Sequence, residues 1–198
     1  AVLDAGASII NDIWALRWKS GLDGLDGEQV VAQHGKCGIC LMHMHRDPQS
    51  MQVQPMQGTV EEVVREVAEF LQKRSSVLRS LGVSKDRSVL DPGIGFGKTT
   101  AHNLALLAQQ AVLQEGGHAV LAGWSRKSSL GAVLELLPPG ITDVDHRCSL
   151  LPHERSLASV AAALLAVEKG ARIVRVHDVA ATRQALAVWE AMTRVSAA

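Results

Sequence analysis

The sequence contains few cysteines and few aromatic residues, and it has no excess of charge of either sign. Among its 198 residues, 20 Lys and Arg balance 20 Asp and Glu, so the chain has no basic field that would hold nucleic acid or an anionic membrane nonspecifically. No apolar run approaches the roughly 18 residues that span a bilayer. We therefore expect neither a nucleic acid nor a membrane among its partners.

The three cysteines, Cys37, Cys40 and Cys148, are too few and too unevenly spaced for a disulfide framework. This usage is typical of a reducing compartment, so we expect a cytoplasmic protein. Cys37 and Cys40 have the spacing of a redox pair, but they run into a strand pattern rather than opening a helix, which favours core packing. Hydrophobic residues make up 47% of the chain and exclude strong disorder.

Short apolar runs alternate with longer amphipathic segments along the whole chain. The runs are four to seven residues long and predict buried parallel strands at residues 8–13, 38–44, 88–91, 119–124 and 172–177. Apolar residues at helical spacing predict helices at residues 59–81, 101–114, 154–168 and 180–193. This alternation predicts a single α/β domain over residues 1–198, built from βαβ units around a parallel sheet.

The first residues have the pattern of a helix end rather than of a chain start. Residues 1–6 indicate a last helical turn that stops at a C-cap glycine, Gly6, and leads straight into the first strand. A closed (β/α)8 barrel has eight strands in about 250 residues. We therefore expect an incomplete (β/α)8 TIM barrel of about five parallel strands, as a C-terminal portion that lacks the first three βα repeats.

Polar residues lie at or just after the carboxyl end of every predicted strand, where parallel α/β folds bind their ligands. A purely structural domain has no reason to repeat this pattern five times, so it indicates an active site. The residues are Asn11, Asp12, His43, His45, Asp91, Ser125, Arg126, Lys127, Ser128, Arg175 and His177.

Arg175 and His177 are two residues apart, which places both side chains on the same face of one strand. Such a pair suits a polyanion such as diphosphate, because a guanidinium binds anionic oxygens in a bidentate manner. A structural ion pair with Asp91 or Asp178 is the alternative. Lys127 is either a further ligand-binding cation or a helix N-terminal cation, and the second placement is electrostatically unfavourable.

The segment 91–99 (DPGIGFGKT) almost matches a phosphate-binding P-loop, but Pro92 occupies the position of the first required glycine. A glycine-rich turn without further function is a second interpretation. The favoured one has Asp91 pointing into a pocket while the glycines let the backbone pass close to a flat ligand. His43 and His45 could ligate a metal, although one buried histidine and one loop histidine is the commoner arrangement.

These residues, in this order, resemble the dihydropteroate synthase family. The resemblance rests on five blocks in register, which span most of the chain: residues 10–13, 40–52, 91–98, 123–128 and 175–179. It implies that the chain corresponds to the fourth through eighth strands of the family's barrel.

The resemblance implies a transferase of folate biosynthesis. This enzyme joins p-aminobenzoate to 6-hydroxymethyl-7,8-dihydropterin diphosphate and gives 7,8-dihydropteroate and diphosphate. The catalytic residues would be Asp91, Lys127, Arg175 and His177. The pterin would be bound by Asn11, Met42, Asp91, Gly123, Lys127 and Arg175. Phe96 and Ser128 would seat p-aminobenzoate, and Arg175 with His177 would hold the diphosphate.

The resemblance further implies that Mg²⁺ accompanies the diphosphate and that the protein is a sulfonamide target. It also implies a homodimer formed through the late helices, which are those predicted at residues 101–114, 154–168 and 180–193. The family's metal-binding Asn belongs to the first strand and would lie upstream of Ala1, so we expect no metal ligand in this chain. Another pterin-binding Asp and two mobile loops would lie there as well. The chain alone is therefore expected to fold poorly and to turn over slowly or not at all. Residues 138–155 also look longer than the family needs.

Two alternatives remain open. The first is another pterin-binding barrel, such as a methyltetrahydrofolate-type methyltransferase domain, which shares the Asp and Asn pterin contacts but needs no diphosphate site. The second is a noncatalytic truncated chain that only binds pterin or assembles with a partner.

Overall fold

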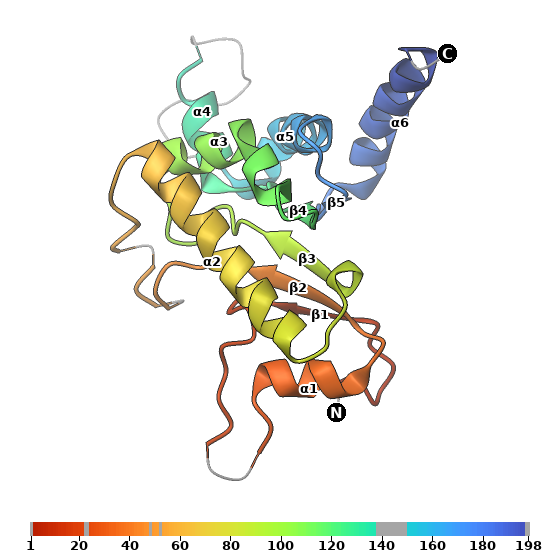
Figure 1. The fold of residues 1–198 in the computed structure, drawn as a ribbon. Helices are drawn as coiled ribbons and strands as arrows, with labels where there is room; N and C mark the ends of the chain where they lie inside the picture. The colour runs from red at the N-terminus through yellow and green to blue at the C-terminus, as the bar shows by residue number, and fades with distance from the viewer. Residues whose placement is uncertain (1, 22–23, 48, 52, 138–149, 197–198) are drawn as a thin grey trace.

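The computed structural model describes residues 2–21, 24–47, 49–51, 53–137 and 150–196 (Figure 1). Strands and helices alternate along the chain as predicted. The strands are β1 (Ile9–Asp12), β2 (Gly38–Met42), β3 (Ser88–Asp91), β4 (Ala119–Ala122) and β5 (Ile173–Val174). The α-helices are α1 (Gly27–His34), α2 (Val60–Ser80), α3 (Thr100–Ala108), α4 (Ser128–Leu134), α5 (Ser156–Glu168) and α6 (Val179–Ser196). Short 3-10 helices are η1 (Lys85–Arg87), η2 (Gln110–Gln114) and η3 (Pro152–Arg155).

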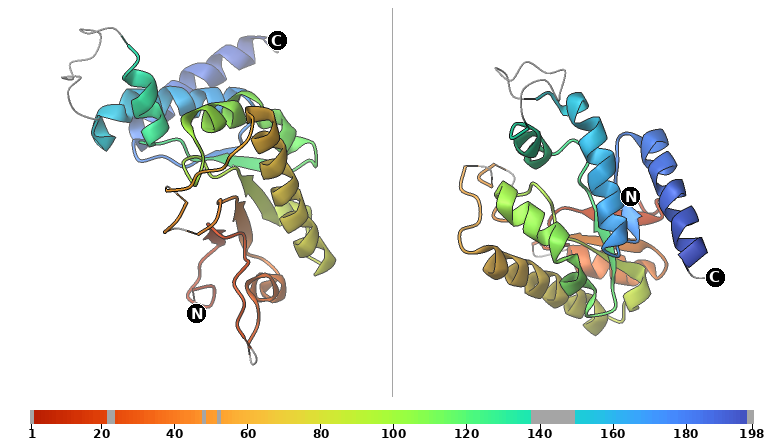
Figure 2. Two further views of the ribbon diagram at one scale, coloured as in Figure 1. Left: turned by 90° about the vertical axis from the view of Figure 1, so that its left-hand side faces the viewer. Right: turned by 90° about the horizontal axis from the view of Figure 1, so that it is seen from above.

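The five strands form one parallel sheet in the order β1-β2-β3-β4-β5, which is also their order in the chain. Sequential parallel order is the arrangement of successive βα units in a barrel. The helices α2, α3 and α5 lie on one side of this curved sheet (Figures 1 and 2). The structure is therefore an incomplete (β/α)8 barrel, as the sequence predicts.

Helix ends follow the signals in the sequence. Thr59 caps α2, since its side chain accepts from the Glu62 amide at 3.2 Å while the Glu62 carboxylate accepts from the Thr59 amide. At the N-terminus, the Gly6 amide donates to the Leu3 carbonyl and the Ala7 amide to the Val2 carbonyl, both at 3.0 Å. These two bonds and the positive φ of Gly6 make a Schellman motif. The predicted helix-end geometry of residues 1–6 is thus confirmed for residues 2–6.

Two helices were not predicted. α1 is only eight residues long, and its capping box joins Asp26 and Gln29 rather than the more usual Ser or Thr with Glu. α4 has seven residues and begins directly after Lys127. Both are shorter than the window over which helical periodicity becomes legible. The segment predicted as one helix over 101–114 is an α-helix followed by a 3-10 turn, α3 and η2.

The pleat divides the sheet residues into two sets. Ile39, Leu41, Leu90 and Val120 face the helices and join the main hydrophobic core. The alternate residues Cys40, Val89 and Leu121 form a smaller apolar cluster on the other face. This second face corresponds to the lumen of a barrel. The three residues lie on it within the strands, before the strands' carboxyl ends.

No helix of the described residues is long and apolar enough to cross a membrane.

Candidate functional site

The sheet register brings five predicted pterin-binding residues to one face. Asn11 lies opposite Cys40, Met42 lies opposite Asp91, and Leu121 lies opposite Ile173. Because side chains alternate between faces, Gly123 and Arg175, each two residues further on, share the lumen face with Leu121 and Ile173. Residues distant in sequence therefore converge at the carboxyl ends of the strands.

Asp91 is the most deeply buried ionisable group of this face. It has no exposed surface, and its Oδ1 accepts a hydrogen bond from the Gly93 amide at 2.8 Å. Arg175 Nη2 lies 2.9 Å from Oδ2, which makes an ion pair, but no described donor is aligned for a hydrogen bond to that oxygen. Burial raises the pKa of Asp91, and the Arg175 charge opposes the rise. Oδ2 thus keeps acceptor capacity for a ligand.

Arg175 therefore makes the structural ion pair that was the alternative to a ligand-binding role. The two roles are compatible, because the side chain of Arg175 remains 41% exposed while the side chain of Asp91 is fully buried. Gly123 makes room for this pairing. A Cβ atom at Gly123 would lie 2.6 Å from Arg175 Nη2, so the guanidinium crosses the sheet over bare backbone.

Lys127 reaches the site from the loop after β4. Its Nζ lies 4.3 Å from the centroid of the Phe96 ring, in a cation–π contact. Burial lowers the pKa of Lys127, while the negative charge of Asp91 raises it. Lys127 occupies the N-cap position of α4, where an ammonium, which has donors only, cannot cap the free helix amides.

His177 lies at the open side of the same region. Its Nδ1 is 2.9 Å from the Ser125 hydroxyl, which also accepts from the His177 amide at 3.1 Å. Asp178, the other proposed ion-pair partner, is engaged elsewhere: its carboxylate accepts from Arg126 at 2.9 and 3.3 Å. Ser125 therefore fixes the His177 ring, and the Nε2 edge is left for a ligand.

A cavity of about 500 Å³ is lined by Arg175, Lys127 and His177 among others, whereas Asp91, Met42 and Asn11 do not line it. The residues that line it are Phe96, Gly123, Ser125, Arg126, Lys127, Pro152, Arg175, Val176 and His177. Ser128, predicted to seat p-aminobenzoate, is exposed at the start of α4 and does not line this cavity. Asn11 is exposed on β1, at the far edge of the same face.

The glycine-rich loop after β3 is not a phosphate cradle. Lys98, the lysine of the P-loop-like pattern, is 7% exposed, and its Nζ donates to the carbonyl oxygens of His43, Gly93 and Phe96 at 3.3, 3.0 and 3.2 Å. Burial lowers the pKa of Lys98 to about 7. All three donors of its ammonium are used by backbone, which removes Lys98 from phosphate binding.

The expectation that these glycines let backbone approach a flat ligand is corrected for two of them. Gly93 and Gly97 have positive φ values, and a Cβ at Gly93 would lie 1.9 Å from the His43 carbonyl oxygen. A Cβ at Gly97 would lie 2.7 Å from the Cβ of His45. Both glycines instead allow the loop after β3 to pack against the loop after β2.

His43 and His45 do not form a metal site. His43 is buried with its ring edge-on to Phe70 at 5.0 Å, and burial lowers its pKa to about 2. In the described part of the chain, no group of three or more His, Cys, Asp or Glu could hold a metal ion. Cys37 and Cys40 are buried free thiols, as expected for core residues, and burial raises the pKa of Cys40 to about 12.

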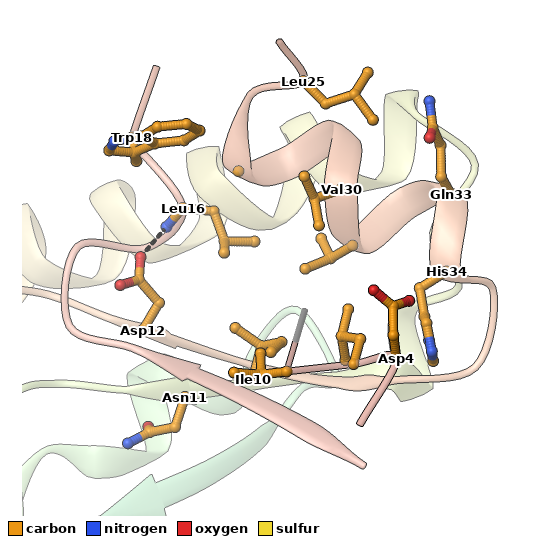
Figure 3. Close-up of a pocket in the computed structure, with 14 residues that line it drawn as sticks. Asp4, Ile10, Asn11, Asp12, Leu16, Trp18, Leu25, Val30, Gln33 and His34 are labelled. Carbon is orange, nitrogen blue, oxygen red and sulfur yellow. Dashed lines mark hydrogen bonds between the residues drawn. The ribbon is translucent and has the colours of Figure 1, made fainter. Parts of the chain in front are cut away.

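A second cavity, of about 740 Å³, lies on the opposite side of β1, between that strand, α1 and the N-terminal turn. Figure 3 shows that Asp12 and Ile10 face α1 while Asn11 points away from it. Asp12 Oδ2 accepts from the Leu16 amide at 2.6 Å, so this carboxylate organises the following loop. Asp12 was grouped with the polar strand-end residues, but the pleat separates it from Asn11.

Two buried residues that support the site were not predicted. Asn103 in α3 and Ser129 in α4 carry hydrogen bonds between the loops after β3 and β4. Neither follows a strand end, where the sequence pattern was informative. A fully buried Asn inside a helix would have been the signal, but burial is not legible from the sequence.

Comparison with known proteins relates this site to a family. Residues 1–177 match the family model described as pterin binding enzyme. The dihydropteroate synthase of Haemophilus influenzae is 41% identical over 188 residues, covering 95% of this chain and 60% of that protein. The Escherichia coli enzyme of the same name is 36% identical over 186 residues, covering 94% of this chain and 57% of that protein.

Solved structures give the same relation. Burkholderia cenocepacia dihydropteroate synthase in complex with 7,8-dihydropteroate superposes with a TM-score of 0.80 at 44% identity, covering 98% of this chain and 64% of that one. The Xanthomonas albilineans enzyme with 4-aminobenzoic acid gives a TM-score of 0.78 at 40% identity, with 96% and 62% covered. The chain spans about 60% of the length of the curated relatives cited above. It belongs to the family of pterin-binding enzymes.

Proposed function

We propose that this chain carries the pterin and diphosphate half of a dihydropteroate synthase site. The reaction would join p-aminobenzoate to 6-hydroxymethyl-7,8-dihydropterin diphosphate and release diphosphate. The observation that carries the proposal is the buried Asp91 carboxylate paired with Arg175 over Gly123, with Lys127 and His177 around the adjoining cavity. The likeness to relatives of this name supports it.

The pterin would lie on the lumen face. A pterin edge is a dense array of hydrogen-bond donors and acceptors, and buried partners discriminate sharply between such edges. Asp91 Oδ2 would accept from the ring, and Asn11 would supply an amide from β1. Met42 and Gly123 would lie against the ring plane, and Arg175 would lie over it. Lys127 would donate to a ring acceptor.

Arg175 and His177 would hold the diphosphate. In the reaction, the bond between the pterin methylene carbon and the diphosphate oxygen breaks, and the amine nitrogen of p-aminobenzoate bonds to that carbon and loses a proton. Negative charge grows on the departing diphosphate, where Arg175 and His177 would stabilise it, and positive charge grows on the pterin, where Asp91 would do so.

Magnesium is implied by the resemblance to accompany the diphosphate. The described residues contain no group of three or more His, Cys, Asp or Glu that could hold a metal ion by themselves. No step is therefore attributed to the ion. Charge stabilisation on the diphosphate falls to Arg175 and His177 among the described residues.

Phe96 and Ser128 would seat p-aminobenzoate, with Phe96 as the apolar wall beside Lys127. Ser128 is the weaker assignment, because its side chain is exposed outside the cavity. A sulfonamide would compete with p-aminobenzoate, and the solved complex of the Yersinia pestis enzyme with a sulfonamide drug supports this.

A homodimer through the late helices and a cytoplasmic location belong to the same proposal. The exposed apolar residues Leu157 of α5 and Val188 and Val195 of α6 are 83%, 73% and 79% exposed, and they support a partner surface there. Sedimentation of the purified chain tests the dimer: a monomer at tens of micromolar concentration would contradict it. The buried free thiols Cys37 and Cys40 support a reducing compartment.

Release of diphosphate that depends on p-aminobenzoate tests the reaction. We expect the chain to bind 7,8-dihydropteroate and to turn over slowly. Binding without turnover would favour the noncatalytic alternative. Turnover of methyltetrahydrofolate without diphosphate release would favour the methyltransferase alternative.

A further inference from the structure

One buried side-chain amide joins the two loops that carry Phe96 and Lys127. Asn103, on α3, has no exposed surface. Its Oδ1 accepts from the Gly95 amide at 3.0 Å, in the loop after β3. Its Nδ2 donates to the Ser129 hydroxyl at 2.9 Å, in the first turn of α4. A third bond, at 3.4 Å, runs from Nδ2 to the Lys98 carbonyl.

The loop after β3 is also held from its other side. Lys98 Nζ donates to the carbonyl oxygens of Phe96 and Gly93 and to that of His43 after β2. The Phe96 amide closes the turn onto the Gly93 carbonyl at 3.0 Å. With its backbone fixed on both sides, the loop leaves the Phe96 ring little freedom apart from its own rotamers.

The two residues joined by Asn103 are close neighbours of the cavity wall. Gly95 immediately precedes Phe96, and Ser129 follows Lys127 by two residues. Phe96 and Lys127 make the cation–π contact at 4.3 Å that forms one wall of the cavity. Asn103 itself does not line the cavity. Its three hydrogen bonds therefore act on the separation between the ring and the ammonium.

We propose that Asn103 is a positioning residue that sets the Phe96–Lys127 wall for the p-aminobenzoate end of the ligand. This proposal rests on the proposed function, because it assigns a substrate moiety to that wall. An Asn fits the position because it offers an acceptor to the Gly95 amide and donors to Ser129 and Lys98 at once. Asp lacks the donors, and Leu lacks both.

A buried amide needs partners wherever it lies, so the positioning role must be separated from simple stability. The chain offers a matched control in Gln110. This residue is 2% exposed in η2, and its Nε2 donates to the carbonyl oxygens of Ala166 and Lys169 at 3.0 and 3.2 Å. Neither Gln110 nor its partners line the cavity.

The first measurement needs no ligand. Backbone amide hydrogen exchange is compared for the wild-type chain, Asn103→Ala and Gln110→Ala. We expect exchange at both 93–98 and 125–131 to accelerate at least about tenfold in Asn103→Ala, because each loop loses a bond to the other. Gln110→Ala should change exchange near 166–170 instead. If the exchange rates at 93–98 and 125–131 were the same in Asn103→Ala as in Gln110→Ala, the proposal would be overturned.

The second measurement compares two ligands by calorimetry: 7,8-dihydropteroate, and 6-hydroxymethylpterin, which lacks the aminobenzoate. Asn103→Ala should weaken binding of dihydropteroate about tenfold and of the pterin by less than about threefold. Gln110→Ala should change both by less than about threefold. If Asn103→Ala weakened the binding of both ligands equally, Asn103 would only stabilise the fold, and the proposal would be overturned.

Ser129→Ala is the second variant if Asn103→Ala does not fold, because it removes only the link to α4. It should weaken dihydropteroate in the same direction by a smaller factor, and no change with Ser129→Ala would count against the proposal. A wild-type chain whose protected amides show that it is folded, but which binds neither ligand, would refute the proposed function. The exchange measurement would then decide alone whether Asn103 couples the loops.

Discussion

The central and edge strands of the sheet have similar sequences but very different environments. β3 (SVLD) is buried at every position, whereas β1 (IIND) alternates between exposed and half-buried residues. Ile9 and Ile173, on the lumen face of the two edge strands β1 and β5, are 58% and 42% exposed. These two isoleucines therefore remain partly exposed, although their apolar side chains are of the kind that central strands bury. Each edge strand pairs on one side only within the described residues.

The same contrast runs through the candidate site. Its central part, Asp91 with Met42, is inside the protein and held by hydrogen bonds and packing. Its edge parts, Asn11 and His177, are exposed to solvent. The centre of the site is thus preorganised by tertiary contacts, while its periphery depends on what else covers the lumen face.

The largest expected effect separates the centre of the sheet from its edge. Leu41→Ala removes a side chain with no exposed surface and should lower the free energy of unfolding by about 2–5 kcal/mol. Ile9→Ala, at 58% exposure on β1, should change it by less than about 0.5 kcal/mol. Urea unfolding at constant m-value measures both. Similar losses for the two variants would mean that β1 is as well packed as β2.

The second prediction concerns pH and the end of the central strand β2. Burial lowers the pKa of His43 to about 2, so the unfolded chain binds more protons than the folded one below the ordinary histidine pKa. The contribution is present above about pH 6.5 and is lost as the pH falls, by about 2 kcal/mol between about pH 7 and about pH 5. His43→Gln should remove that part of the decline in unfolding free energy. Parallel profiles for wild type and variant would show that His43 does not titrate this way.

The third prediction compares centre and edge inside the site. Asp91→Asn should lower affinity for the pterin, and turnover where it is measurable, at least about tenfold, because hydrogen bonds to charged groups contribute about 1.5–3 kcal/mol. Asn11→Ala should cost only about three- to tenfold, since a neutral hydrogen bond contributes about 0.5–1.5 kcal/mol. Calorimetric titration with a pterin ranks them. A near-normal affinity in Asp91→Asn would remove Asp91 from the site.

The smallest effect is expected at Gly123. A Cβ there would meet Arg175 Nη2 at 2.6 Å, but this is the far end of a flexible, part-exposed side chain that can move. Gly123→Ala should therefore weaken diphosphate binding a few-fold, because Arg175 must shift from its place over the backbone. A large loss of unfolding free energy in Gly123→Ala, with unchanged diphosphate binding, would contradict this prediction.

The secondary structure was largely predictable because its signals are local. Strand runs are apolar over consecutive residues, and glycine stops such as Gly82 and Gly170 end α2 and α5. The short helices α1 and α4 fell below the length at which periodicity is readable. Residues 138–149, singled out as an unusually long segment together with 150–155, lie outside the described residues. The described remainder, residues 150–155, contains η3, whose Pro152 lines the cavity.

The sequence by itself determined the order of the strands and the residues placed at their carboxyl ends, because period-two alternation and parallel connection rules act along the chain. The five-block resemblance added the family. Only the tertiary structure decided which of those residues face one another: Asp12 turned away from Asn11, Lys98 turned inward to three carbonyls, and Asp91 paired with Arg175. Pairings between residues 84 positions apart depend on register and burial, which no local pattern encodes.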